Sequence, residues 1–158
     1  MRKIRSRKAV SPVIATVILV AVAITVAVAV SYWMGGITSQ YTTFEKVEIQ
    51  AGICTWDNTG NGSWKITLKL KNSGTATATL NSIFINDIEA ATYGQDSASG
   101  TNEVATNMTT STSIPSGAST IVNIYVDLGY AYLSAGTTVN IKVHSAGGMD
   151  YIKLIELV

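Results

Sequence analysis

The side chains that could carry catalysis or bind a metal are few and scattered. The chain has one histidine, one cysteine and ten carboxylates, and the carboxylates show no spacing typical of a calcium-binding loop. One histidine and one cysteine cannot supply the four ligands of a structural zinc site. His144 alternates with apolar neighbours, which places it on the polar face of a predicted strand as a solvated imidazole. The sequence therefore predicts no enzyme, no metal and no cofactor.

Covalent modification is the chemistry that the motifs do support. The triplets Asn61-Gly62-Ser63 and Asn107-Met108-Thr109 match the acceptor pattern for N-linked glycans. Both lie in predicted exposed turns, so Asn61 and Asn107 are candidate glycosylation sites. The Ser- and Thr-rich tract 101–113 is an alternative carrier of O-linked sugar, and a plain solvated loop is the simpler reading of it.

The start of the chain combines a basic cluster with a long apolar segment. Five of the first eight residues are basic, and no charged side chain follows between Ala9 and Phe44. The run Val10–Met34 exceeds the roughly 20 apolar residues that a helix needs to span a bilayer. The basic cluster is expected to keep the N-terminus cytoplasmic and to send the rest of the chain outward. Its members are Arg2, Lys3, Arg5, Arg7 and Lys8.

A cleaved secretory signal fits this segment poorly. Such a signal has an apolar region of about 7–15 residues followed by a small-residue cleavage site. Here the apolar run is longer, and it closes with the bulky residues Tyr32, Trp33 and Met34. A permanent signal anchor is the better alternative.

The residues at the edge of the apolar segment form a specific motif. The stretch RKAVSPVIATVIL, residues 7–19, resembles the N-terminus of archaeal type IV pilins. This resemblance implies that a prepilin peptidase cuts between Ala9 and Val10 and that a pilus assembly machinery takes up the mature subunit. Ile14 stands where bacterial type IV pilins carry a glutamate, which agrees with the archaeal branch. Pro12 lies near the helix start, where its missing N–H costs least.

The apolar helix is predicted to pack against copies of itself after the leader is removed. Lipid tails are as apolar as these side chains, so dispersion and close packing must drive the association. We expect the helix to continue past Gly35 and Gly36 to about Ser39–Phe44, although glycines weaken a helix. The predicted packing positions are Val13, Ile14, Val17, Ile18, Ala21, Ile24 and Val28.

Beyond Phe44 the hydrophobic period changes from helical to alternating, which predicts β-strands. Gly147–Gly148 marks a hairpin, whereas Thr92–Ser113 is predicted as a long loop with a short strand around Val104–Met108. The predicted strands are Lys46–Ile53, Trp64–Lys71, Thr77–Asn86, Thr120–Asp127, Thr138–His144 and Tyr151–Val158. The fold class is therefore α+β, with a long N-terminal hydrophobic α-helix followed by an antiparallel, immunoglobulin-like β-sandwich.

These patterns divide the chain into three parts. Residues 1–9 form a leader, residues 10–44 form a helix that is transmembrane in the precursor and central in a filament, and residues 45–158 form the outer domain. Within the domain, Trp64 is predicted to lie in the core and Trp56 at the surface. Cys54 has no intrachain disulfide partner. It is expected to be a buried small hydrophobe, and pairing between subunits is the alternative.

Charge and resemblance together define the expected function. From Val10 onward the chain has six lysines against ten carboxylates, a net charge of −4, which argues against nucleic acid as a partner. The pilin resemblance implies a structural subunit of an extracellular filament, a homopolymer held by helix packing and used for adhesion. The alternatives are a membrane-anchored surface binding module, a minor pilin and an archaeal flagellum subunit.

Overall fold

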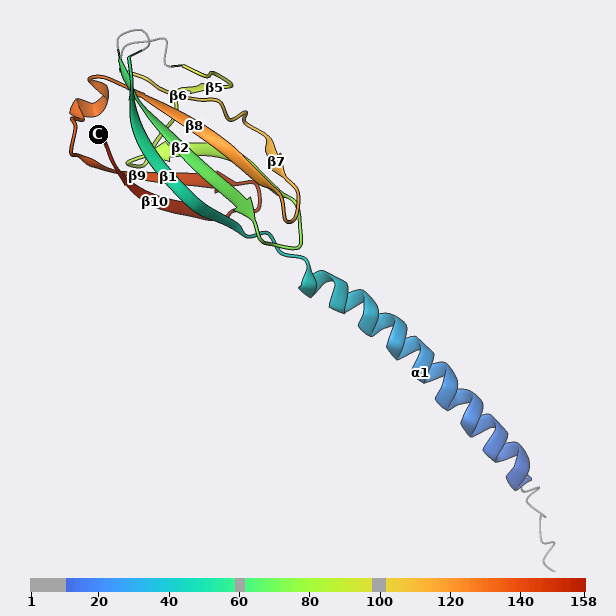
Figure 1. Ribbon diagram of the computed structural model, residues 1–158. Helices are drawn as coiled ribbons and strands as arrows, with labels where there is room; N and C mark the ends of the chain where they lie inside the picture. Colours follow the sequence, from blue (N-terminus) through green and yellow to red (C-terminus); the bar gives the residue numbers. More distant parts are fainter. Residues whose placement is uncertain (1–10, 59–61, 98–101) are drawn as a thin grey trace, which may run out of the picture. The chain divides into compact units, whose positions relative to one another are not determined.

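The computed structural model describes residues 11–58, 62–97 and 102–158, and the chain divides into two compact units between Thr42 and Thr43 (Figure 1). The first unit is helix α1, Pro12–Thr42. Its first turn is closed by the Ser11 carbonyl, which accepts hydrogen bonds from the amides of Ile14 and Ala15 at 2.9 and 3.1 Å. Proline suits the first helical position because it has no amide hydrogen to leave unpaired.

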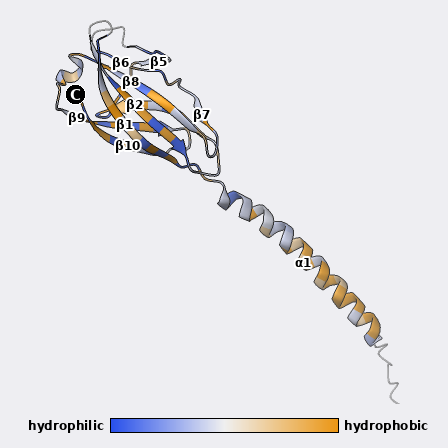
Figure 2. Ribbon diagram, in the orientation of Figure 1, coloured by the Kyte–Doolittle hydropathy of each residue, from blue (hydrophilic) through white to orange (hydrophobic). Residues whose placement is uncertain are grey.

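Helix α1 changes in character along its length. Figure 2 shows its N-terminal part as hydrophobic and its last turns as more polar. The helix runs without a break through Gly35 and Gly36 to Thr42, which confirms that the glycines do not end it. Around both glycines there is open space, so no packing constraint explains why these positions lack a side chain.

The second unit is a sandwich of two sheets. The first sheet has the strand order β1-β2-β8-β6-β5, and the second has the order β10-β9-β3-β4, with β7 also paired to β3. The pairing of β5 with β6 is parallel, and the other pairings among the described residues are antiparallel. The strands of the first sheet are β1 (Val47–Asp57), β2 (Ser63–Asn72), β8 (Ser119–Asp127), β6 (Val104–Thr106) and β5 (Thr92–Tyr93). Those of the second are β10 (Asp150–Glu156), β9 (Thr138–Ser145), β3 (Ala78–Ile85), β4 (Ile88–Glu89) and β7 (Thr112–Ile114), and a 3-10 turn covers Tyr130–Tyr132.

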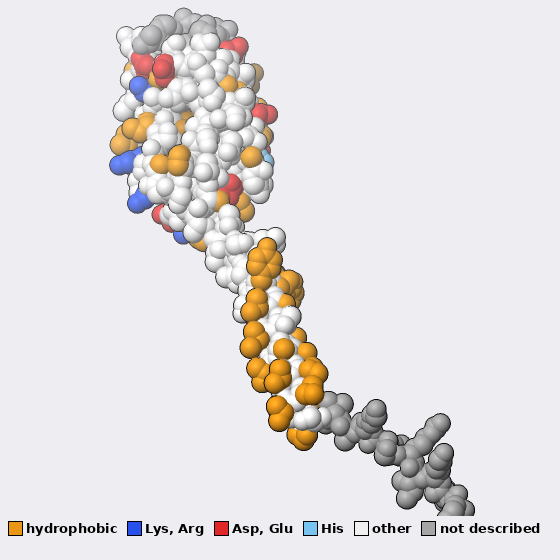
Figure 3. Space-filling view, turned by 90° about the vertical axis from the view of Figure 1, so that its right-hand side faces the viewer, with side chains coloured by type: hydrophobic (Ala, Val, Ile, Leu, Met, Phe, Trp, Pro, Cys, Tyr) orange, Lys and Arg blue, Asp and Glu red, His pale blue; other side chains and the backbone are white. Residues whose placement is uncertain are grey.

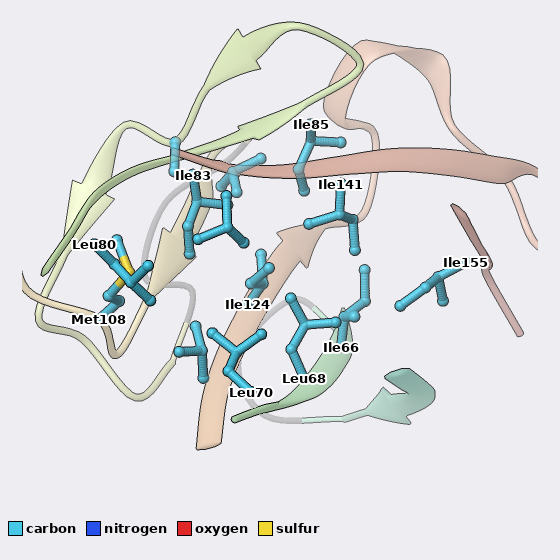
Figure 4. Packing of buried hydrophobic residues seen from close by; sticks show 14 of the residues in the cluster. Ile66, Leu68, Leu70, Leu80, Ile83, Ile85, Met108, Ile124, Ile141 and Ile155 are labelled. Carbon is cyan, nitrogen blue, oxygen red and sulfur yellow. The ribbon is translucent and has the colours of Figure 1, made fainter. Parts of the chain in front are cut away.

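The core lies between the two sheets and follows from the alternation of each strand. In β2 the apolar residues Ile66, Leu68 and Leu70 are fully buried, and the residues between them face outward. Ile83 and Ile141 close the core from the second sheet (Figure 4). Side chains of period two fill one face of a strand, so the sequence pattern alone selects the buried face. The long apolar helix followed by a two-sheet antiparallel domain confirms the predicted α+β class.

The segment predicted as a long loop has more structure than expected. Strands β5, β6 and β7 all lie within Thr92–Ser113 or end one residue after it, and all three residues of β6 are buried. A three-residue strand is too short to show a period, so its burial could not be recognised from the alternation of residue types.

Two single residues test the predicted core. Trp64 is buried, as predicted, and its indole Nε1 donates to the carbonyl of Val158 at 2.8 Å. Cys54 is half-buried rather than fully buried, because β1 is the edge strand of its sheet. Burial raises the pKa of the Cys54 thiol above its ordinary value, which disfavours the reactive thiolate.

Candidate functional site

Helix α1 is a long, exposed apolar surface. None of its residues is buried, and it is the one helix in the described part of the chain that is long and apolar enough to cross a membrane. At 1.5 Å per residue, its 31 residues give a length of about 46 Å, against a hydrocarbon thickness of about 30 Å. The helix is therefore long enough to span a bilayer with roughly ten residues to spare.

The two threonine hydroxyls in the apolar part of α1 form hydrogen bonds within the helix. Thr16 Oγ1 donates to the carbonyl of Val13 at 2.9 Å, and Thr25 Oγ1 donates to the carbonyl of Ala21 at 2.8 Å. A polar hydrogen without a partner is costly in an apolar medium. Because these threonines turn back onto the backbone, they remain compatible with surroundings of lipid or of packed apolar helices.

The predicted packing positions all lie on α1, and their side chains are exposed. They are Val13, Ile14, Val17, Ile18, Ala21, Ile24 and Val28. Apolar residues surround the helix on every side, as the neighbouring residues Leu19, Val20 and Val22 show. The structure therefore does not single out one packing face, and these positions stay a prediction.

Several predicted site residues lie outside the described residues. They are the leader cations Arg2, Lys3, Arg5, Arg7 and Lys8, the cleavage-site pair Ala9 and Val10, and the candidate glycan acceptor Asn61.

The second glycan acceptor, Asn107, lies in a more ordered setting than the predicted exposed turn. Asn107 is half-buried, and its Oδ1 accepts a hydrogen bond from the amide of Asn123 at 2.8 Å. The next residue, Met108, is buried, whereas Thr109 is exposed. The side chain thus bridges to β8 through its oxygen.

His144 has a partner that the sequence analysis missed. Its Nδ1 lies 2.6 Å from Oδ1 of Asp150, and the two residues are paired across the β9–β10 hairpin. A two-residue turn at Gly147–Gly148 would place His144 opposite Tyr151, so the predicted hairpin is correct in place but its register is shifted by one residue. The described residues hold no group of three or more His, Cys, Asp or Glu side chains placed to bind a metal.

The three residues directly before β1 form hydrogen bonds to two segments that are distant in the sequence. We call Phe44–Lys46 the anchor segment. The Phe44 carbonyl accepts hydrogen bonds from the amides of Thr75 and Ala76, both at 2.9 Å. The Glu45 carboxylate accepts a short hydrogen bond from Ser145 Oγ. The anchor segment is therefore tied to the β2–β3 turn and to the β9–β10 turn, a site that sequence reasoning did not find.

Replacing Gly74 by alanine is expected to destabilise the domain by about 2 kcal/mol, since crowding a packed site costs about 1–3 kcal/mol. A Cβ at Gly74 would lie 2.6 Å from both the Lys46 amide nitrogen and the Phe44 carbonyl oxygen. These are backbone atoms, so the anchor segment itself must shift. Urea unfolding of the full-length protein in detergent, followed by tryptophan fluorescence, measures the change.

The matched control is Gly147→Ala. Its Cβ would meet the Glu45 carboxylate at 2.5 Å, the end of a flexible side chain that can rotate away. We expect the Gly147→Ala protein to lose less stability than the Gly74→Ala protein. The reverse order would show that the backbone of the anchor segment does not constrain position 74.

We expect Asp127 to make the stability of the domain pH-dependent. Burial raises the pKa of its carboxyl above the ordinary value of 3.8. The Glu103 amide donates to Oδ2 at 3.3 Å and lowers this pKa in part, whereas the negative charge of Glu103 raises it further. The folded state then binds this proton more tightly than the unfolded state does, so stability falls as pH rises from about 3.8 through the folded-state pKa.

We expect Asp127→Asn to be more stable than the unmodified chain at pH 7 and to have a flatter stability profile just above pH 4. The asparagine oxygen can still accept the Glu103 amide hydrogen. Unfolding in urea at a series of pH values provides the measurement, with the exposed Asp96→Asn as the matched surface control. A loss of stability at pH 7 in the Asp127→Asn protein would contradict the proposed cost of burial.

Comparisons with known proteins give distant structural similarities. No family model matches the sequence, and no curated protein matches it. Among solved structures, the chain is similar to the archaellum periplasmic stator protein FlaG from Sulfolobus acidocaldarius, at 16% identity over 71% of this chain and 100% of that chain, with a TM-score of 0.43. It is also similar to the archaeal flagellum of Methanospirillum hungatei strain JF1, at 16% identity over 94% of each chain, with a TM-score of 0.47. Because the identities and TM-scores are low, no property of this chain is inferred from either protein.

Proposed function

We propose that this chain is a structural subunit of an extracellular type IV pilus-like filament that polymerises through α1. The observation that carries the proposal is the long apolar helix with no buried residue. Fully burying a Val, Leu or Ile side chain stabilises by about 1.5–3 kcal/mol, and the exposed aliphatic side chains of α1 forgo a large part of this free energy. Lipid or other copies of the helix must therefore cover this surface.

A helix with this composition suits both environments in turn. The precursor places α1 in the membrane, and assembly exchanges lipid contacts for contacts with other helices. Small residues such as Ala21 and Ala27 let helices approach closely, so dispersion can drive the exchange. The threonine hydroxyls remain bonded to their own helix throughout. Head-to-tail contacts that do not close then generate a filament.

The finer parts of the proposal come from the pilin-like N-terminus. A prepilin peptidase removes residues 1–9 by cutting between Ala9 and Val10, and an assembly machinery extracts the mature subunit from the membrane. The β-sandwich forms the outer layer, without enzymatic activity or cofactor, and carries glycans at Asn61 and Asn107. Adhesion is the role that we propose for the filament.

The N-terminal residue and the mass of the protein in sheared extracellular filaments test this proposal. We expect Val10 as the first residue, and a mass above that of residues 10–158 if either asparagine carries a glycan. Full-length protein that stays in the detergent-soluble membrane fraction, with no filaments, would contradict the proposal. That result would favour the membrane-anchored binding module, because α1 can also serve as a permanent anchor.

The position of the cut can be tested separately. Replacing Ala9 by a bulky residue is expected to leave the uncleaved precursor in the membrane, whereas normal filaments from this variant would refute the proposed cleavage site.

A further inference from the structure

The outer face of the first sheet combines two exposed isoleucines with lysines. Ile53 is 60% exposed and Ile121 is 58% exposed. Directly paired side chains point to the same side of a sheet. Ile53 is paired with Thr67, and Ile121 is paired with Lys69. Because Thr67 and Lys69 are two residues apart on β2, they lie on one face, and the two isoleucines therefore share that face. We define the lysine face by Ile53, Ile121, Lys65, Lys69 and Lys71.

The lysine face has a surplus of positive charge. Glu48 forms an ion pair with Lys46 at 2.8 Å. The other two carboxylates on this side of the sheet, Asp57 and the buried Asp127, both lie beside Ser63 at one end of β2, away from Lys69 and Lys71. Among the described residues, no carboxylate lies within ion-pair distance of Lys65 or Lys69. Cations next to exposed apolar side chains offer both electrostatic and apolar contact to a partner of negative charge.

The outer face of the second sheet has the opposite character. Ile152 is 57% exposed and Leu154 is 64% exposed, and both lie on the edge strand β10. Asp150 and Glu156 flank these two residues on the same face of that strand, because all four are spaced two residues apart. We define the acidic face by Ile152, Leu154, Asp87, Asp150 and Glu156.

On the acidic face, carboxylates outnumber cations. Lys142 is the lysine of this outer face, where it pairs with Asp87 at 2.9 Å and lies over the ring of Phe84. Figure 3 shows lysines gathered along one border of the domain and the histidine at the opposite border. The two faces are the outer surfaces of one sandwich, so they point in opposite directions.

We propose that the lysine face of one copy packs against the acidic face of the next copy. This inference rests on the proposed filament function and specifies which surfaces of the outer domains meet. Two lysine faces would bring like charges together, which disfavours a closed, symmetric pair. A lysine face against an acidic face matches charge and covers isoleucine with leucine and isoleucine. Such a contact is heterologous and leaves both ends free, so it can repeat without limit.

The edge strand β10 favours a contact between sheet faces over the pairing of its edge with a strand of another copy. Lys153 is paired with Ile141, whose side chain is buried, yet Lys153 is exposed at the edge of β10. A charged side chain directed toward the interior side of an edge strand is a known obstacle to pairing with another chain. The β10 edge is therefore blocked, while the face that carries Leu154 remains open.

Chemical cross-linking of filaments made from the full-length protein tests the proposed contact. In a Cys54→Ala background, the variant I121C/L154C places one thiol on each face, and a short bismaleimide joins nearby thiols. We expect a ladder of covalent oligomers from I121C/L154C. Neither I121C nor L154C alone should give oligomers, and the matched pair I53C/I121C, with both thiols on the lysine face, should give no ladder.

The outcomes separate this inference from the proposed function. Filaments of I121C/L154C that yield no ladder overturn the inference but leave the filament function standing. A dimer from I121C alone also overturns it, because that result requires two lysine faces in contact. If the unmodified chain forms no filaments, the proposed function fails, and the inference that rests on it fails too.

Exchange of charge gives a second, independent test. We expect K65E/K69E alone and D150K/E156K alone each to lower filament mass about tenfold or more, since like charges in contact cost several kcal/mol and each 1.4 kcal/mol is a factor of ten. Co-expression of the two variants should restore mixed filaments, because each reversed face then meets a complementary one. Two correctly folded variants that each assemble normally, or that do not assemble when mixed, overturn the inference.

Discussion

An aspartate in place of Ile24 is expected to remove about 99% of the filaments, while the β-sandwich stays folded. Ile24 lies in the middle of the apolar part of α1 and is 59% exposed in the single chain. An ionised side chain at the centre of a membrane helix costs about 2.5–3.5 kcal/mol. This corresponds to a factor of about 60–300 in the equilibrium between apolar surroundings and water. The mass of protein in sheared filaments, compared with the cell-associated protein, provides the measurement.

Two control variants separate charge from shape in this experiment. Ile24→Leu keeps an apolar side chain of equal size and should assemble as the unmodified chain does. Thr38→Lys places a charge in the more polar last turns of α1 and is expected to have a smaller effect. Normal filaments from the Ile24→Asp protein would mean that Ile24 does not lie in apolar surroundings in the filament.

Replacing Asn72 by alanine is expected to destabilise the domain by about 3–4 kcal/mol. Asn72 is fully buried at the end of β2. Its Nδ2 donates to the carbonyls of Ala76 and Ile114 at 2.7 and 2.9 Å, and its Oδ1 accepts from the Gly74 amide at 2.9 Å. Alanine would leave these backbone groups without partners, and a buried polar group without a partner costs about 1–3 kcal/mol.

The shift in the urea midpoint of the full-length protein measures this loss. Asn72→Asp retains the size and the acceptor but loses both donors, so it should be destabilised at pH 7 despite leaving no cavity. Asn58→Ala, at an exposed position, is the control and should change stability by no more than about 0.5 kcal/mol. If Asn72→Ala behaves like Asn58→Ala, the hydrogen bonds of Asn72 do not hold the turn.

Local periodicity was sufficient to predict α1 and the long strands. The apolar run of α1 is uninterrupted by charge, and β2 alternates strictly between lysine or threonine and buried aliphatic residues. Each of these features spans at least two periods, so the sequence alone shows it. Strand β6 has three residues, which is less than two periods of the alternating pattern, so it could not be recognised from the sequence.

Contacts between distant parts of the sequence could not be predicted in this way. The hydrogen bond from Ser145 to Glu45 joins residues one hundred positions apart, and nothing in either local pattern indicates the other partner. The lysine face likewise depends on the strand order, because Ile53 and Ile121 become neighbours of β2 only when β1 and β8 flank it. The His144–Asp150 pair was missed for a related reason: a two-residue turn at Gly147–Gly148 places Tyr151 opposite His144, and the register of the hairpin is shifted by one residue.

The anchor segment has a mechanical consequence. In the proposed filament, a subunit under tension must transmit force between its β-sandwich and the chain that leaves this domain at Thr43. At Phe44–Lys46 that load is divided among several hydrogen bonds. The amides of Thr75 and Ala76 donate to the Phe44 carbonyl, and the Ser73 amide donates to the Lys46 carbonyl at 2.8 Å. Ser145 Oγ donates to the Glu45 carboxylate. The β2–β3 turn joins the first sheet to the second, and the β9–β10 turn belongs to the second. A pull on the chain is therefore shared by both sheets before β1 can begin to peel away.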